Sequence, residues 1–418
     1  MTRQSENMRT ARIAIALYAV AMILLLCAPS AAGATRTWTG GAGTGNWNTA
    51  GNWSGSAVPG SNDTALFDGT SSTNCQINAN VNVQAIEIQS GYNGTITQGA
   101  GFTITVGGNG ITMAGGTFLG GADMIDSNGA LDISGGTFRS TSGILYIFKN
   151  FTVSGGSFNH NGGTVTLDGW DKTVSIGSTN LNHLVYATGG NSITLSGTVQ
   201  LLGNLTIQSV NYMSGGTLSI KGNVTTNDTS IIGYPGTVLQ FDGTGNQSLI
   251  AGVANAQVPS VTINKPSGTL TIQGPIGVFN HWTHTAGAVD CGAQPLHFVG
   301  YDKTIAAGSM TYGSVVINTG GNSVSVSGTM NVTGNLTIQS VNYVSNGTIA
   351  VKGDVTTLDS NVNGYPATTI LIDGSGSQTL SAGGGYGEVP AVKIDKPSGT
   401  LTIVDRIGVH KDWTHTAG

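Results

Sequence analysis

The sequence predicts an all-β protein that folds as a parallel β-helix, or β-solenoid, behind an N-terminal capping segment. Two patterns predict this fold: a long segment that occurs twice, and a shorter rhythm of strands bounded by glycine. The composition agrees, because 66 of the 418 residues are Gly and only 8% are charged, whereas an ordinary soluble domain has about 7% Gly and about 25% charge. A net charge of −5 is too small to favour disorder.

The long repeat has a period of 131 residues. Residues 203–212 recur letter for letter as residues 334–343, and no gap opens between the two copies. Further segments related by the same offset are residues 171–173 and 302–304, residues 265–272 and 396–403, and residues 282–287 and 413–418. A fixed long period indicates an array of stacked units.

The short rhythm consists of a Gly-Gly-Thr-Phe or Gly-Gly-Ser-Phe motif. It begins at Gly115, Gly135 and Gly155, in steps of 20 residues. A short run that alternates apolar and polar residues precedes each motif, which is typical of a strand with one buried face. Such a strand and turn make one coil of a β-helix. The 131-residue unit would then form about six coils and rise about 29 Å, and the mature chain would be about 85–90 Å long.

The first 34 residues have the layout of a secretory signal. Three arginines precede an apolar run, residues 13–26, and small residues follow it. We expect cleavage after Ala32 or Ala34, and therefore a secreted, extracellular or cell-surface location. A membrane anchor would need nearer 20 apolar residues, so we expect no membrane span in the mature chain. Cys27 leaves a lipoprotein signal as a further alternative.

The mature chain divides into four segments. Residues 35–83 are rich in Trp and Gly, and we expect Trp38, Trp47 and Trp53 to cap the apolar end of the first coil. The alternative for these tryptophans is an exposed platform that binds sugars. The remaining segments are coils with the 20-residue rhythm at 84–151, a first repeat unit at 152–282, and a second repeat unit at 283–418.

The second unit stops at residues 413–418, where the first unit continues. We therefore expect a truncated unit and a longer native product. A last coil without a neighbour would expose apolar side chains and unpaired strand edges, which predicts end-to-end self-association.

Three motifs of the sequence resemble the tandem elements of large secreted bacterial surface proteins. They are Phe-Asp-Gly-x-Gly-x-Gln at residues 241–247, Gly-Asn-Leu-Thr-Ile at residues 203–207, and Trp-Thr-x-x-x-Gly at residues 413–418. The passenger regions of autotransporters and filamentous haemagglutinins are similar. The resemblance implies a right-handed parallel β-helix, export, and a role in adhesion or surface coating. It supplies no catalytic residue.

The cysteines and the repeated apolar residues carry three structural expectations. We expect Cys75 and Cys291 to be buried and unpaired. The aromatic residues at one repeat position, Phe151, Trp282 and Trp413, are expected to fill the interior. The alternating apolar residues that should point inward are Leu205, Ile207, Leu270, Ile272, Leu336, Ile338, Leu401 and Ile403.

Few residues suggest chemistry, and we expect no catalytic residue, no cofactor and no metal. His281 and His284 are the best metal candidates, but residues three apart on a strand face opposite sides, and Asp412 occupies position 281 in the second unit. His410 and His415 form a second loose cluster with Asp412. Four Asp-Gly pairs could suggest calcium, but they are also strong turn signals. These pairs begin at Asp68, Asp168, Asp242 and Asp373.

The candidate ligand contacts are Tyr212 and Tyr343, beside Asn211 and Asn342, since each pair follows a strand at a predicted turn. Glycans or other surface polymers are the partners that we expect. The mature chain has only three arginines, which excludes a basic stripe for nucleic acid.

The predicted function is that of a non-enzymatic adhesin, stalk or coat protein that acts by multivalent contacts. The alternatives are a β-helical enzyme that acts on polysaccharide, in the manner of a lyase, and a protein that binds ice or mineral through threonine ladders. Such ladders would use Thr-x-Thr pairs, for example Thr269 and Thr271, but the pairs are irregularly spaced.

Overall fold

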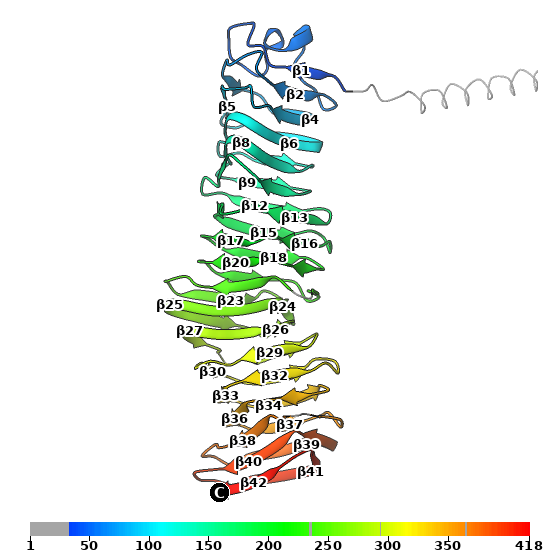
Figure 1. Cartoon of the computed structure of the whole chain (residues 1–418), viewed down its shortest axis with the longest axis vertical. Coiled ribbons are helices and arrows are strands. Elements are labelled where there is room, and N and C mark those ends of the chain that lie inside the picture. The colour runs from blue at the N-terminus through cyan, green and yellow to red at the C-terminus, as the bar shows by residue number, and fades with distance from the viewer. Residues whose placement is uncertain (1–32, 234–235, 293, 364–365) are drawn as a thin grey trace, which may run out of the picture.

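The computed structural model describes residues 33–233, 236–292, 294–363 and 366–418, and it has the predicted β-solenoid fold. Strands make up 56% of the chain and wind into about 17 turns. The coils stack along one axis, from β1 near one end to β42 at the other (Figure 1). In the described ranges, strands of neighbouring coils pair in parallel, for example Thr217–Ile220 with Thr198–Leu201. The signal prediction for residues 1–34 falls almost entirely outside the described residues.

A typical coil of the first unit has three sides, each made of one short strand. The strands of the first side are β12 (Thr164–Asp168), β15 (His183–Ala187), β18 (Leu205–Ser209), β21 (Val224–Thr226) and β23 (Gln247–Ala251). The second side has β13 (Lys172–Ser175), β16 (Ile193–Leu195) and β19 (Met213–Ser214). The third side has β14 (Asn180–Leu181), β17 (Thr198–Leu201), β20 (Thr217–Ile220) and β22 (Val238–Phe241).

The second unit repeats this arrangement. Its first side has β28 (Leu296–Val299), β31 (Val315–Asn318), β34 (Leu336–Ser340), β37 (Val355–Thr357), β39 (Gln378–Val389) and β41 (Leu401–Val409). Its second side has β29 (Lys303–Ala306), β32 (Val324–Ser327) and β35 (Val344–Ser345). Its third side has β30 (Thr311–Tyr312), β33 (Thr329–Val332), β36 (Thr348–Val351), β38 (Thr369–Ile372), β40 (Ala391–Asp395) and β42 (Trp413–Ala417).

The tryptophan-rich segment closes the N-terminal end of the core. Trp38, Trp47 and Trp53 are at most 2% exposed, and their rings lie 5.8, 6.0 and 5.5 Å from the ring of Phe67. Burial excludes the exposed sugar platform. The ladder of coils already begins within this segment, because β1 (Thr35–Thr37) pairs with β2 (Thr64–Phe67), which pairs with β4 (Val81–Ile88).

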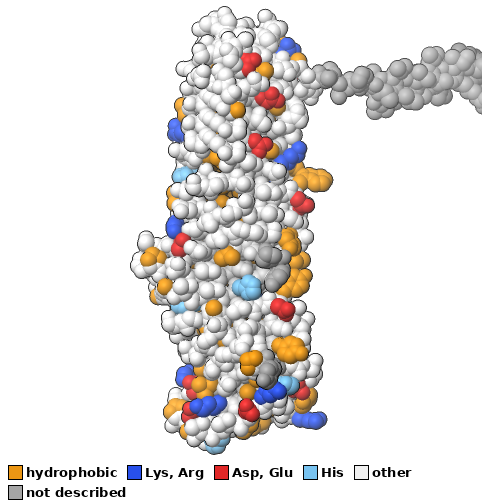
Figure 2. All heavy atoms as spheres, viewed as in Figure 1, with side chains coloured by type: hydrophobic (Ala, Val, Ile, Leu, Met, Phe, Trp, Pro, Cys, Tyr) orange, Lys and Arg blue, Asp and Glu red, His pale blue; other side chains and the backbone are white. Residues whose placement is uncertain are grey.

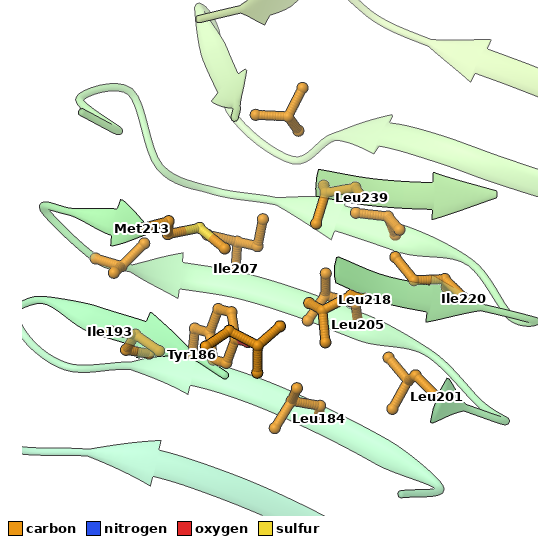
Figure 3. Packing of buried hydrophobic residues seen from close by; sticks show 14 of the residues in the cluster. Leu184, Tyr186, Ile193, Leu201, Leu205, Ile207, Met213, Leu218, Ile220 and Leu239 are labelled. Atoms are coloured by element: carbon orange, nitrogen blue, oxygen red, sulfur yellow. The ribbon is translucent and has the colours of Figure 1, made fainter. Parts of the chain in front are cut away.

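The interior holds most of the residues that the sequence predicts for it. Six of the eight predicted Leu and Ile side chains are at most 4% exposed, and Figure 3 shows Leu205 and Ile207 packed among the side chains of neighbouring coils. Phe151 and Trp282 are fully buried, and Cys75 and Cys291 are buried and free, as predicted.

Three residues of the last coil contradict the prediction of a buried interior position. Ile403 is 50% exposed, Trp413 is 42% exposed and Leu401 is only partly buried. The reason is that β41 and β42 each pair with the preceding coil only, within the described residues. Their equivalents in the first unit are covered on both sides.

Ile272 and Ile403 provide a matched test of this packing, because they occupy the same position of two identical segments. We expect Ile272→Ala to lower the free energy of unfolding by about 2–4 kcal/mol, since it leaves a cavity between two coils. Ile403→Ala should cost less than about 1 kcal/mol. Urea unfolding followed by circular dichroism measures both, and equal losses would contradict the assigned burial.

Candidate functional site

Two turns of the same build join the first side of the solenoid to the second. Residues 169–171 connect β12 to β13, and residues 300–302 connect β28 to β29. Each turn starts with a glycine whose φ is 75° or 82°, a left-handed conformation that other residues resist. The next residue is an aromatic one that projects outward: Trp170 is 69% exposed and Tyr301 is 46% exposed.

A buried lysine follows each aromatic turn and holds it from inside. The Nζ atom of Lys303 donates hydrogen bonds to the carbonyl oxygens of Phe279, at 2.7 Å, and Val299. Lys172 Nζ likewise donates to the carbonyl of Phe148, at 2.8 Å. Both lysines are 4% exposed. Since carbonyl groups at a turn have no strand partner, the ammonium groups satisfy acceptors that would otherwise be buried and unpaired.

Polar side chains tie the second turn to the following coil. Asp302 Oδ1 accepts a hydrogen bond from the backbone nitrogen of Ser323 at 2.6 Å. Asn322 Nδ2 donates to the carbonyl oxygens of Thr319, at 2.8 Å, and Gly300, at 3.3 Å. The residues of the first unit that make the equivalent contacts are Asp171, Ser192, Asn191, Thr188 and Gly169. Both turns are therefore fixed in position before any ligand binds.

The tyrosines predicted from the sequence, Tyr212 and Tyr343, lie on the same edge. Each is one coil beyond the asparagine, Asn191 or Asn322, that holds the aromatic turn. The backbone nitrogen of Asn211 donates to the carbonyl of Asn191 at 3.2 Å, which places Tyr212 beyond that coil. Tyr212 is half-buried and Asn211 is exposed, whereas Tyr343 is 43% exposed. In the second unit the corresponding bond joins Asn342, which is half-buried, to Asn322 at 3.1 Å.

We call Trp170, Tyr212, Tyr301 and Tyr343 the aromatic edge. Figure 2 shows hydrophobic side chains at intervals along one margin of the molecule. Sequence reasoning found the two tyrosines that lie inside an identical repeated segment. It missed Trp170 and Tyr301 because the aromatic residue differs between the units, although the Asp-Lys-Thr that follows each of them is repeated.

A hollow of about 370 Å³ opens on the aromatic edge at the junction of the two units. Its lining residues are Tyr212, Ile232, Tyr301, Asp302 and Asn322. The first two residues belong to the first unit and the other three to the second unit, so the hollow belongs to neither unit alone.

One turn at the junction is much shorter than its neighbours. Only Pro259 separates β24 (Ala256–Val258) from β25 (Ser260–Gln273), whereas three residues separate β26 (Ile276–Val278) from β27 (Trp282–Asp290), as in the turn of residues 300–302. The strand ladder itself continues through these coils, because β22 pairs with β25, β25 with β27 and β27 with β29. The shortened turn lies between the coil of Ile232 and the coil of Tyr301, whose residues line the hollow.

The described residues that line the hollow supply hydrogen-bond acceptors and include no basic residue. Among the described residues, Asp302 Oδ2 and Asn322 Oδ1 have no hydrogen-bond partner, because Asp302 uses its other oxygen and Asn322 uses its nitrogen. Phe279 packs edge-on against Tyr301, with ring centroids 5.4 Å apart, and so supports the tyrosine ring.

The two histidines of the metal candidate are engaged separately. His281 Nδ1 accepts a hydrogen bond from the backbone nitrogen of Thr304 at 3.0 Å. His284 is buried, and its Nε2 lies 2.9 Å from the carbonyl oxygen of Gly287. Within the part of the chain that the structure describes, no three His, Cys, Asp or Glu residues gather closely enough to hold a metal ion.

The Asp-Gly carboxylates act singly, as turn or ion-pair residues. Asp242 lies 2.9 Å from Lys221, and Asp373 lies 2.6 Å from Lys352, so the same ion pair occurs in both units. Asp68 Oδ1 accepts from the backbone nitrogen of Thr70 at 2.8 Å, as in a tight turn. None of these contacts assembles the several oxygen ligands that calcium requires.

Asp168 and Asp126 form a separate pair of perturbed carboxyl groups. Burial raises the pKa of Asp168, and burial together with the charge of Asp168 raises the pKa of Asp126. Perturbed carboxyl groups occur in many active sites and also in structural networks. Neither residue lines the hollow.

These features define a tandem-repeat β-solenoid with a preorganised aromatic edge and a hollow at the junction of its repeat units. The chain matches no protein-family model, no curated protein sequence and no solved structure. Among its described residues, none belongs to a helix with the length and apolar character needed to span a membrane.

The buried lysines predict how stability depends on pH. Burial lowers the pKa of Lys303 to about 7 and that of Lys172 to about 8, whereas each returns to its ordinary value of about 10.4 on unfolding. Above pH 7 the unfolded chain therefore binds more protons than the folded chain. The free energy of unfolding should rise with pH, by at most about 1.4 kcal/mol per pH unit for each lysine.

Urea unfolding between pH 7 and about 8.5 tests this prediction. The wild type and the variants are compared at each pH, so that the ionisation of unfolded cysteines, whose pKa is about 8.5, cancels. Lys303→Met should reduce the slope of stability against pH, and Lys172→Met should reduce it further in the double variant. Both should also lower stability, because they leave turn carbonyls unpaired. A slope that is unchanged in the double variant would contradict the prediction.

Proposed function

We propose that this protein is a secreted or cell-surface, non-enzymatic β-solenoid that binds a surface polymer through many weak contacts along its aromatic edge. One observation carries the proposal. Exposed or half-exposed aromatic residues occupy equivalent places in the two units, with Trp170 matching Tyr301 and Tyr212 matching Tyr343. Aromatic side chains supply large contact areas with little conformational freedom to lose, which suits a binding surface.

The solenoid suits multivalent binding because it is long and its repeats are fixed in register. Tyr212 and Tyr343 lie about six coils apart, which is about 29 Å at the spacing of paired strands. A polymer that contacts one turn is held close to the next turn at a high effective concentration. Several weak contacts can then give an affinity that no single contact reaches.

Export is supported by the arginines, apolar run and small residues of the first 34 positions. The resemblance of the repeated motifs to autotransporter passengers and filamentous haemagglutinins supports the same location. Mass spectrometry of the extracellular or surface-extracted protein tests it. The expected N-terminus is residue 33 or 35, and retention of residues 1–32 in a cytosolic product would contradict it.

Multivalent binding predicts a characteristic response to substitution at the aromatic edge. Trp170→Ala and Tyr343→Ala should each weaken binding to an intact surface polymer by about threefold to tenfold, and the double variant should lose about the product of the two. Pull-down on isolated cell-envelope material measures this. Leu202→Ala is the matched control, because Leu202 is 43% exposed at a different corner, between β17 and β18. Equal losses for Leu202→Ala would count against the aromatic edge.

We further propose that the last coil associates with a second copy of the same coil. Ile403 and Trp413 expose apolar surface there, whereas the N-terminal end of the core is closed by buried tryptophans. The contact would therefore join two C-terminal coils and would be symmetric.

Sedimentation velocity tests this association. The chain of residues 35–418 should form dimers as its concentration rises. The double variant Ile403→Thr with Trp413→Ser should remain monomeric. A wild-type chain that stays monomeric at high concentration would refute the association.

A further inference from the structure

We infer that the hollow at the unit junction is a subsite for one sugar ring of an uncharged, hydroxyl-rich polysaccharide. The inference rests on the proposed function and names the ligand class of its aromatic edge. It is carried by the size of the hollow, by the chemistry of its lining and by the absence of basic groups from the described residues of that lining.

The size and walls of the hollow suit a small ring. A volume of about 370 Å³ lies near the lower limit for small-molecule sites, which is about 300 Å³. Tyr212 and Tyr301 contribute aromatic rings and Ile232 contributes an aliphatic side chain. One face of a sugar ring presents C–H groups with a slight positive charge, and these pack favourably on the negative face of an aromatic ring.

The polar groups of the hollow complement hydroxyl donors. Asp302 Oδ2 and Asn322 Oδ1 are acceptors without protein partners among the described residues, and the other polar atoms of both side chains already hold them in place. A hydroxyl group that donates to the Asp302 carboxylate forms a charge-assisted hydrogen bond. A polyol therefore satisfies both acceptors, which a purely apolar ligand would leave unpaired.

The same lining disfavours an anionic polymer. Among the described residues that line the hollow, Asp302 is the only charged one. The nearest lysine in sequence, Lys303, is 4% exposed and donates inward to backbone carbonyls. A uronate, sulfate or phosphate group would meet a carboxylate with no compensating cation, which is unfavourable.

Preorganisation supports binding at this place rather than at any exposed tyrosine. Lys303 and Asn322 fix the turn that carries Tyr301, and Phe279 supports its ring. A ligand then has little side-chain or backbone freedom to restrict when it binds.

Trp170 provides an internal comparison for the hollow. Its turn has the same glycine, aspartate and lysine as the turn of Tyr301. It lies, however, next to regular coils with the 20-residue rhythm, and no tyrosine equivalent to Tyr212 precedes it by the same distance in sequence. A contact at Trp170 would use one aromatic surface, whereas the junction has two aromatic surfaces on one open hollow.

Isothermal titration calorimetry on the purified protein tests the inference with four hexasaccharides. Cellohexaose, mannohexaose and chitohexaose are uncharged, and hexagalacturonate is acidic. We expect at least one uncharged hexamer to bind more tightly than the acidic one. Tyr301→Ala and Asp302→Ala should each weaken that binding by about tenfold or more, Tyr301→Phe should retain it to within about threefold, and Leu202→Ala, at a different corner, should leave it unchanged.

Three outcomes would overturn the inference: tighter binding of hexagalacturonate, no binding of any hexamer, or equal binding by wild type and Tyr301→Ala. Thermal unfolding of each variant serves as the control for folding, and Tyr301→Phe keeps the test valid if the alanine variant is unstable.

Pull-down on envelope material distinguishes failure of the junction subsite from failure of the proposed function. Envelope binding that depends on Trp170 and Tyr343, without binding of a hexamer, would refute the junction subsite alone. Hexamer binding that depends on Tyr301, without envelope binding, would refute the multivalent surface role alone.

Discussion

The parallel pairing of each strand with its equivalent in the next coil is the interaction on which the rest of this structure depends. Leu184 pairs with Leu205, and Leu205 pairs with Val224, so one inward position is repeated from coil to coil. This stacking places like side chains on one another, as with Phe118 and Phe138, whose parallel rings lie 4.7 Å apart. Because each coil is covered only by its two neighbours, stability is a sum of local interfaces.

The turns lie outside that ladder, and polar side chains take the place of strand pairing there. Lys265 Nζ donates to the carbonyl oxygens of Gly243 and Gly245, at 2.8 and 2.9 Å, and to Gln247 Oε1 at 2.7 Å. The second unit repeats this network through Lys396 and Gln378. The repeated Asp-Gly-x-Gly-x-Gln and Lys-Pro-Ser-Gly motifs therefore form internal polar networks. These networks preserve the shape of the turns.

The division between ladder and turn also locates the proposed binding surface. Core positions leave little freedom for variation, whereas a turn such as residues 300–302 can present an aromatic side chain outward while Lys303 holds it from within. The hollow adds a condition that single repeats do not meet. It needs the end of one unit, with Tyr212 and Ile232, and the start of the next, with Tyr301 and Asp302. The two proposed contacts, at the junction and along the edge, would therefore differ in specificity on one scaffold.

The sequence by itself determined the coil, the period and the inward residues, because each depends on local alternation and on exact repetition. It also placed Tyr212 and Tyr343 at turns, since both follow repeated strands. Only the tertiary structure decided that Ile403 and Trp413 are exposed, because burial depends on a covering coil and not on the residue's own segment. It alone brought Tyr212 and Tyr301 to one hollow. These residues are 89 positions apart, and they lie on either side of a turn that is shortened to Pro259, which no periodic pattern records.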